Sequence, residues 1–150
     1  MIEVRRAAGD DAAAVAAVFL DSFHATYEFP LAHTDDEVRG WIRDRLIPEH
    51  EVWVATDEGR VVALLALAPG WVEQLYVAPE RLGQGIGGRL LALAKARQPD
   101  ALQLWTFQVN GRARRFYEHH GFVPVEQTDG SGNEERQPDV RYEWQGPATG

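Results

Sequence analysis

The sequence contains no cysteine and a single methionine. It therefore has no disulfide framework, no thiolate nucleophile and no cysteine-based zinc site, and we predict no metal centre. Positive charge is also in the minority, with 15 Lys and Arg against 23 Asp and Glu and a formal net charge of −8. Because a nucleic-acid backbone is bound by clustered positive charge, we expect no nucleic-acid partner.

Long hydrophobic runs are missing as well. The longest uncharged run, residues 61–72, is interrupted by Pro69-Gly70 and is too short for a membrane span, which needs about 20 apolar residues. The first residues, Met1–Arg6, lack the apolar stretch of a signal peptide. We therefore expect a cytoplasmic protein without a membrane partner.

The composition that is present is typical of one globular domain. The chain has 150 residues, of which 45% are hydrophobic and 25% are charged. These values are close to globular averages of about 45–50% and about 25%, and the length falls within the range of about 100 to 200 residues for one domain. We predict a single domain over residues 1–150, with 145–150 as a frayed tail. A homodimer is compatible with the sequence.

The hydrophobic pattern predicts a mixed α/β (α+β) sheet covered by helices. Alternating or β-prone runs predict strands over residues 2–6, 51–56, 61–68, 71–77, 101–107, 122–128 and 140–144. Helical spacing predicts a helix capped by Asp10-Asp11, one from Asp35 that ends before Pro48, one behind a glycine cluster, and one capped by Asn110. The resulting order is β-α-α-β-β-β-α-β-α-β-β.

The glycine cluster Gly83–Gly88 separates a strand from a helix. Such a turn presents unpaired backbone N–H groups at the positive end of the helix dipole, which suits a phosphate. No Lys-Ser or Lys-Thr follows, so a nucleoside triphosphate loop is not expected. The spacing also fits the dinucleotide pattern G-x-G-x-x-G, but no carboxylate for a ribose lies near Gln108, which leaves a nicotinamide-dependent oxidoreductase as a weak alternative. A second alternative is that the glycines only form a tight turn that allows close helix packing.

Two stretches of the sequence resemble the GNAT superfamily of N-acetyltransferases. They are Leu75-Tyr76-Val77-Ala78-Pro79-Glu80-Arg81-Leu82-Gly83-Gln84-Gly85-Ile86-Gly87 and, after Asn110, Phe116-Tyr117-Glu118-His119-His120-Gly121-Phe122. The resemblance implies a GNAT-like fold, whose mixed sheet is splayed between the fourth and fifth strands. It also implies acetyl-CoA as cosubstrate, bound in that splay.

The resemblance further implies where the cosubstrate lies. Its pyrophosphate would bind the amides of Gly83–Gly88, and its pantetheine arm would pair with Leu75–Val77 like an added strand. One departure is Leu82, which stands where the family's loop usually begins with Gln or Arg. Asn110 is similar in position to a residue that touches the pantetheine arm, although capping of the next helix explains it equally well. The cofactor-binding candidates are Leu75, Tyr76, Val77, Leu82, Gly83, Gln84, Gly85, Ile86, Gly87, Gly88, Asn110 and Tyr117.

Acetyl transfer to an amine needs a base for the amine and an acid for the departing thiolate. The resemblance implies Tyr117 as the acid, since a phenol with an ordinary pKa near 10 is protonated at neutral pH. For the base we predict Glu73, because strand alternation would put it on one largely apolar face with Trp71, Leu75 and Val77. The alternatives stay open: Tyr117 as core, Glu73 as a solvated carboxylate, and water or a histidine as the base.

The acceptor would bind beside the cosubstrate. The substrate-binding candidates are Tyr27, Phe29, His33 and Trp41, with Glu134, Glu135 and Asp139 available to attract a cation. We therefore predict an acetyl-CoA-dependent N-acetyltransferase acting on a primary amine of a small molecule or peptide. The alternative is a non-catalytic acyl-CoA-binding sensor.

Overall fold

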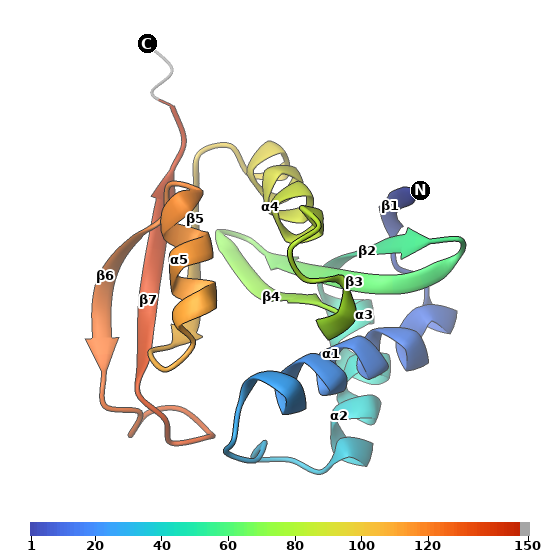
Figure 1. The fold of residues 1–150 in the computed structure, drawn as a ribbon, viewed down its shortest axis with the longest axis horizontal. Coiled ribbons are helices and arrows are strands. Elements are labelled where there is room, and N and C mark those ends of the chain that lie inside the picture. The colour runs from blue at the N-terminus through green and yellow to red at the C-terminus, as the bar shows by residue number, and fades with distance from the viewer. Residues whose placement is uncertain (148–150) are drawn as a thin grey trace.

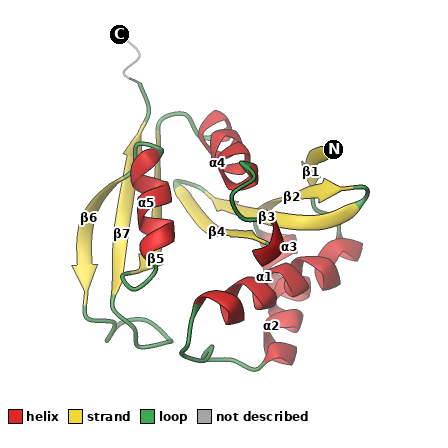
Figure 2. Ribbon diagram, in the orientation of Figure 1, coloured by secondary structure: helices red, strands yellow, loops and turns green. Residues whose placement is uncertain are grey.

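The computed structural model describes residues 1–147 and contains a seven-stranded mixed sheet, shown in Figures 1 and 2. The strands are β1 (Ile2–Arg6), β2 (Glu51–Asp57), β3 (Arg60–Ala68), β4 (Trp71–Val77), β5 (Ala101–Phe107), β6 (Val123–Thr128) and β7 (Asp139–Gln145). Their spatial order is β1-β2-β3-β4-β5-β7-β6. Only β4 and β5 pair in parallel, and every other neighbouring pair is antiparallel. The predicted mixed α/β sheet is confirmed.

Helices cover both faces of this sheet. They are α1 (Ala12–Thr26), α2 (Asp35–Trp41), α3 (Ile47–Glu49), α4 (Ile86–Arg97) and α5 (Gly111–His119). Helices α1 and α2 pack on one face, whereas α4 and α5 pack on the other (Figure 1). Side chains of β3 alternate between the two cores, with Leu65 facing α4 and Leu64 facing α1. Strand β3 is therefore buried on both faces, which explains its almost uninterrupted apolar sequence.

The sheet opens between β4 and β5. Their registered pairing is confined to Trp71 and Gln103 at the start of both strands, next to a hydrogen bond from the Gln103 N–H to the Gly70 carbonyl at 2.9 Å. Beyond this point the strands diverge, and Figure 1 shows β5, β7 and β6 standing apart from the other strands with α5 in front of them. The predicted splay is confirmed. It leaves main-chain groups along one edge of β4 without a neighbouring strand.

Helix boundaries differ from the sequence prediction at two places. The second helix does not end before Pro48, because a π-helical segment (Ile42–Leu46) is followed by a short helical turn that includes this proline. Proline is tolerated there since it lies in the first turn after the change in hydrogen-bonding pattern. The Asp11 carboxylate does not cap α1: it accepts a hydrogen bond from the Ala8 N–H at 2.7 Å and pairs with Arg5 at 2.8 Å.

The end of the chain is ordered further than predicted. Gln145 is the last residue of β7, and the Gly146 N–H donates to the Asp100 carbonyl at 2.8 Å. The expectation of a frayed tail is therefore wrong at these two residues, and residues 148–150 lie outside the described part of the chain. From residue 1 to residue 147, no helix combines the length and the apolar character that crossing a membrane requires.

Candidate active site

The glycine loop between β4 and α4 forms an open cradle of backbone amides. Gly83 and Gly85 have φ values of 80° and 81°, which only glycine adopts readily, and Gly85 precedes the first residue of α4. The first hydrogen bond of the helix runs from the Arg89 N–H to the Gly85 carbonyl. Within the described residues, the N–H groups of Gly83–Gly88 have no acceptor. The first turn of α4 also lacks an acidic side chain, so the positive end of the helix is free to hold an anion.

Gly87 and Gly88 have a different role from that of the two glycines with positive φ. A Cβ on Gly87 would lie 3.3 Å from the ring of Phe116, and one on Gly88 would lie 3.3 Å from the ring of His120. Both neighbours belong to the α5 end of the fold, so these glycines let α4 and α5 pack closely. No described atom lies within 4 Å of a Cβ on Gly85. The cluster thus combines an anion cradle with a helix contact.

The strand that leads into the loop contains a bulge at Glu73. Gln74 of β4 pairs with Ala66 of β3, whereas Val72 pairs with Leu67, so the register skips Glu73. The bulge breaks the strict alternation, and Val72 rather than Trp71 joins the α4 core. Our prediction that Glu73 lies on an apolar face is therefore wrong: its side chain is exposed, although it lines the cleft described below.

Tyr117 lies on α5 with its ring in the core. The ring packs against Phe116, Phe122 and Tyr142 at centroid distances of 5.2 to 6.2 Å, and the residue is 8% exposed. Burial raises the pKa of the Tyr117 phenol, so the hydroxyl stays protonated at neutral pH. No other described residue shares a hydrogen bond with this hydroxyl, and Tyr117 contributes to the lining of the cleft. It is therefore both a core residue and an uncommitted proton donor.

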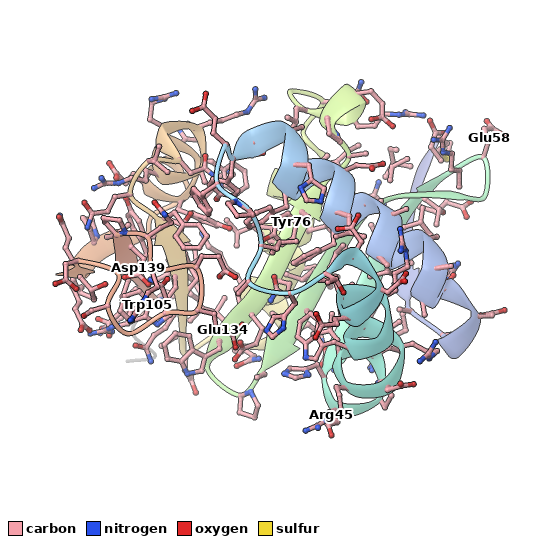
Figure 3. The ribbon with its side chains drawn as sticks, turned by 90° about the horizontal axis from the view of Figure 1, so that it is seen from below. Arg45, Glu58, Tyr76, Trp105, Glu134 and Asp139 are labelled. Carbon is pink, nitrogen blue, oxygen red and sulfur yellow. The ribbon has the colours of Figure 1, made fainter. Side chains whose placement is uncertain are left out.

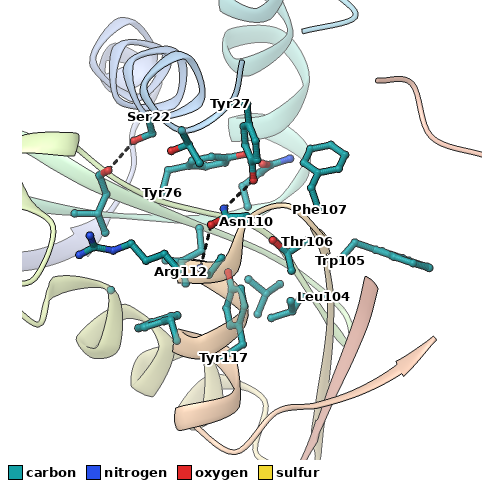
Figure 4. Close-up of a pocket in the computed structure, with 18 of the residues that line it drawn as sticks. Ser22, Tyr27, Tyr76, Leu104, Trp105, Thr106, Phe107, Asn110, Arg112 and Tyr117 are labelled. Atoms are coloured by element: carbon teal, nitrogen blue, oxygen red, sulfur yellow. Dashed lines mark hydrogen bonds between the residues drawn. The ribbon is translucent and has the colours of Figure 1, made fainter. Parts of the chain in front are cut away.

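Asn110 joins the two sides of the splay. Its side-chain carbonyl accepts from the Ala113 N–H at 3.0 Å, which confirms the predicted cap of α5. Its side-chain amide donates to the Tyr27 hydroxyl at 2.8 Å, from across the cleft (Figure 4). Burial raises the pKa of Tyr27, and the hydrogen bonds with Asn110 and Thr106 oppose that effect. Tyr27 thus connects the C-terminal end of α1 with the N-terminal end of α5.

One cleft connects these elements. Its volume is about 1810 Å³, larger than the ~300–1,000 Å³ of pockets for drug-sized ligands. The glycine loop, β4 from Val72 to Val77, Asn110 and Tyr117 all lie along it. The open amide cradle suits a phosphate group, and the unpaired edge of β4 suits an extended chain with amide groups. These residues therefore fit a cosubstrate that carries a pyrophosphate and a peptide-like arm, as coenzyme A does.

The cleft has further lining residues that the sequence analysis did not single out. They include Ser22, Gln74, Trp105, Thr106, Phe107, Arg112, Glu126 and Asn133. Strand alternation contained a signal for Trp105. Leu102 and Leu104 of β5 are buried, so the next residue, Trp105, points to the other face of the strand, and it is 42% exposed. Ser22 was detectable only from the fold, because its hydroxyl donates to the Val77 carbonyl at 2.6 Å across a large sequence separation.

The predicted acceptor residues divide into two groups. Tyr27 lines the cleft, whereas Phe29, His33 and Trp41 are not among its lining residues. Phe29 packs on the rings of Tyr27 and Phe107, with centroid distances of 4.9 and 5.2 Å. It therefore supports two residues that line the cleft without lining the cleft itself. Trp41 lies against Phe19 of α1, with 6.4 Å between the ring centroids. The roles of these residues in acceptor binding stay predictions.

His33 belongs to a clasp between the α1–α2 segment and the β6–β7 loop. Its Nε2 lies 2.6 Å from a carboxylate oxygen of Glu134, and the Ala32 N–H donates to Glu135 at 3.0 Å. The hydrogen bond and charge of Glu134 raise the pKa of His33, with smaller contributions from Glu37 and Glu135. Figure 3 shows Glu134 on the loop beside the segment that follows α1. Two of the acids predicted to attract a cation are therefore used in this clasp.

Asp139 is the third of those acids, and it lies in the cleft lining. It accepts hydrogen bonds from the Thr128 hydroxyl and from Asn133, the latter at 3.1 Å. Among residues 1–147, no group of His, Asp or Glu side chains is arranged to hold a metal ion. The cleft lining includes amides, phenols and carboxylates, together with two arginines (Arg81 and Arg112) and two histidines (His119 and His120).

Comparison with known proteins places this geometry in a family. Residues 48–124 match the model of the acetyltransferase (GNAT) domain. An uncharacterized N-acetyltransferase of Archaeoglobus fulgidus is 30% identical over 149 residues, which cover 89% of this chain and 100% of the relative. Peptidyl-lysine N-acetyltransferase YjaB of Salmonella typhimurium is 30% identical over 123 residues, which cover 81% of this chain and 83% of that protein.

Solved structures share the same fold. The apo form of YjaB from Escherichia coli superimposes with a TM-score of 0.80 at 24% identity, covering 98% of this chain and 99% of the other. YncA from Salmonella typhimurium, solved with its cofactor acetyl-CoA, has a TM-score of 0.73 at 20% identity and covers 100% of this chain and 96% of its own. The expected family and enzyme class are confirmed, and the dinucleotide alternative loses its support. Because the family model spans half of the chain and the archaeal relative matches most of it, the chain belongs to the GNAT family of N-acetyltransferases, with acetyl-CoA as cosubstrate.

Proposed function

We propose that this enzyme acetylates a primary amine of a small molecule or a peptide. The observation that carries the proposal is the continuity of the cleft, along which the amide cradle, the unpaired edge of β4 and the free Tyr117 hydroxyl follow one another. Some relatives are named peptidyl-lysine N-acetyltransferases, which favours a lysine side chain in a peptide as the acceptor. The cytoplasmic location and the homodimer stay predictions.

The cofactor residues divide the binding work between backbone and side chains. We assign the pyrophosphate of acetyl-CoA to the N–H groups of Gly83–Gly88, with Leu82, Gln84 and Ile86 as loop neighbours. Leu75–Val77 would pair with the pantetheine arm through main-chain groups. The Val77 carbonyl already accepts from Ser22, so the pairing would use the remaining main-chain groups of this segment. Asn110, held by Tyr27, would contact the arm from the opposite side.

Two side chains move protons in the proposed reaction. The bound cosubstrate supplies the acetyl group as a thioester. Tyr117 gives its phenolic proton to the departing sulfur, a role that its raised pKa permits because the phenol is protonated before the reaction. Glu73 takes a proton from the acceptor amine, either directly or through a water molecule. Its exposure at the bulge gives the amine access from solvent.

The test is release of free CoA thiol from acetyl-CoA in the presence of an amine panel. The panel contains lysine peptides, polyamines, amino acids and aminoglycosides. We expect turnover with at least one class, with lysine peptides as the first choice. If lysine peptides are inert and a small amine is acetylated, the peptide part of the proposal is wrong and the amine part stands.

The alternative function is a non-catalytic acyl-CoA sensor. It predicts tight binding of acetyl-CoA without turnover of any amine, and a function that Tyr117→Phe does not alter. Membership of a family of N-acetyltransferases favours the enzyme. Binding measured by calorimetry together with the thiol assay separates the two functions.

A further inference from the structure

The loop that we assign to the pyrophosphate has no cation of its own. Its side chains from residue 82 to residue 88 belong to Leu, Gln, Ile and glycines only. Backbone amides at a helix N-terminus supply partial charges that are equivalent to about half an elementary charge. A pyrophosphate carries more negative charge than this, so a full positive charge nearby would add a strong, charge-assisted contact.

Two arginines line the cleft, and their environments differ. Arg81 pairs with Asp57 at 2.7 Å, so its charge is already compensated. Arg112 makes no ion pair or hydrogen bond with any other residue that the structure describes, and it is exposed. Its Nη2 lies 3.9 Å from the position that a Cβ on Gly83 would occupy. In Figure 4 its side chain extends along the cleft, away from Tyr27 and Tyr117.

The position of Arg112 is unfavourable for the helix that contains it. Arg112 is the second residue of α5, and the first turn of this helix has no acidic side chain. A cation near a helix N-terminus opposes the helix dipole, where a carboxylate would stabilise the helix. Neither an ion pair nor the dipole therefore explains Arg112, whereas an anion on the facing loop would.

We infer that Arg112 is the cation of the cofactor site and binds the pyrophosphate of coenzyme A from the α5 side, opposite the amides of the glycine loop. This inference rests on the proposed placement of the pyrophosphate at Gly83–Gly88. It assigns the phosphate contact to two elements, so that the cosubstrate bridges α4 and α5 at the mouth of the splay.

The chain offers a matched control. Arg115 lies on the same helix, is also exposed and has no ion pair among the described residues, but it does not line the cleft. Arg112→Gln and Arg115→Gln change the net charge equally, so they separate a direct contact from a general electrostatic effect. Two ligands distinguish the phosphates: coenzyme A, and dephospho-coenzyme A, which lacks the 3′-phosphate but keeps the pyrophosphate.

The experiment is calorimetric titration of both ligands into the wild type and both variants, at low and high salt. We expect Arg112→Gln to weaken both ligands by the same factor, about tenfold, which corresponds to one charge-assisted hydrogen bond. Arg115→Gln should bind like the wild type. High salt should weaken the wild type more than Arg112→Gln, because screening acts on the contact that the variant lacks. Arg112→Gln should unfold at the same temperature as the wild type or slightly above it, since an unfavourable cation is removed from the helix.

Three results would overturn the inference. Equal affinities of Arg112→Gln and Arg115→Gln would show that no direct contact exists. A loss for coenzyme A that disappears with dephospho-coenzyme A would move Arg112 to the 3′-phosphate. A clear fall in the unfolding temperature of Arg112→Gln would show that the residue stabilises the fold, and its loss of affinity would then follow from that. In contrast, failure of the wild type itself to bind coenzyme A would refute the proposed function rather than the role of Arg112.

Discussion

The two ends of the cleft are built in different ways. The cofactor end comes mainly from one continuous segment, in which β4, the glycine loop and α4 follow each other along the chain. The acceptor end depends on contacts between segments far apart in sequence: Tyr27 is held by a hydrogen bond from Asn110, 83 residues away, and the contact of His33 with Glu134 spans 101 residues. The cofactor end therefore depends on local backbone geometry, whereas the acceptor end depends on how the two parts of the splayed sheet come together.

The difference also fits the chemistry at each end. A pyrophosphate is recognised by backbone amides, whose positions are fixed once the loop and helix have formed. In the proposed function, an acceptor amine would be recognised by side chains along the cleft, such as Tyr27, Trp105 and the carboxylates. We therefore expect substitutions in the loop to act on cofactor affinity, and substitutions at the acceptor end to act on turnover and its pH dependence.

The largest effect should come from a charge in the amide cradle. Gly85→Asp should abolish acetyl-CoA binding, because a carboxylate would face the pyrophosphate, and like charges 4 Å apart repel by about 4 kcal/mol at a surface-like dielectric constant. Gly85→Asn is the matched control, since Asn tolerates positive φ as Asp does and there is open space at this position. Calorimetry measures the affinities, and circular dichroism checks the fold. Equal binding by the two variants would locate the pyrophosphate elsewhere.

Gly87→Asp is a less informative variant than Gly85→Asp. A side chain at Gly87 would press against Phe116 at 3.3 Å, so any substitution there also disturbs the contact between α4 and α5. A loss of binding in Gly87→Asp would therefore combine an effect on the packing of the two helices with the effect of the added charge.

Removal of the Tyr117 hydroxyl should have the next largest effect. Tyr117→Phe should lower kcat by about 10²- to 10⁴-fold, the usual range for loss of a general acid. Because the hydroxyl has no hydrogen-bond partner among the described residues, the melting temperature and the affinity for acetyl-CoA should stay near those of the wild type. Steady-state kinetics and thermal unfolding provide the measurements. An unchanged kcat would return Tyr117 to a purely structural role.

A smaller effect is expected at Glu73. Glu73→Gln should lower kcat/KM by about 10²-fold, the lower end of the range for general base catalysis, because an exposed carboxylate can be partly replaced by water. The wild type should show a rise of kcat/KM with pH that the variant lacks, while cofactor affinity is unaffected. Glu58→Gln, in the turn after β2, is the charge-matched control. If Glu73→Gln keeps the full rate and the wild-type pH profile, the base is water or another residue.

The smallest effect concerns the clasp at the acceptor end. The folded pKa of His33 is raised, chiefly by Glu134, so the ion pair contributes below the ordinary histidine pKa near 6.5 and is lost as the pH rises through the folded value. An NMR titration should therefore give His33 a pKa above 6.5, and Glu134→Gln should lower it. Glu49→Gln, on α3, should leave it unchanged. If the pKa of His33 is the same in Glu134→Gln as in the wild type, the clasp does not form in solution.

The sequence by itself determined the features that depend on neighbouring residues. The strand β4 follows from a run of β-prone residues and the cap of α5 by Asn110 from capping chemistry, and the loop Gly83–Gly88 follows from its glycine spacing. The two motifs around these elements were enough to indicate the family and its cosubstrate. Such features are local because hydrogen bonds and steric limits act within a few residues.

The tertiary structure alone decided the features that need distant partners. Glu73 leaves the apolar face because β3 and β4 pair with a bulge, and no pattern within β4 announces it. Arg112 faces Gly83, and Tyr27 holds Asn110, only after α5 has packed beside α4 and the α1–α2 segment has reached the β6–β7 loop. These contacts depend on the angle of the splay, which is set by the packing of both cores and not by the preferences of any single segment.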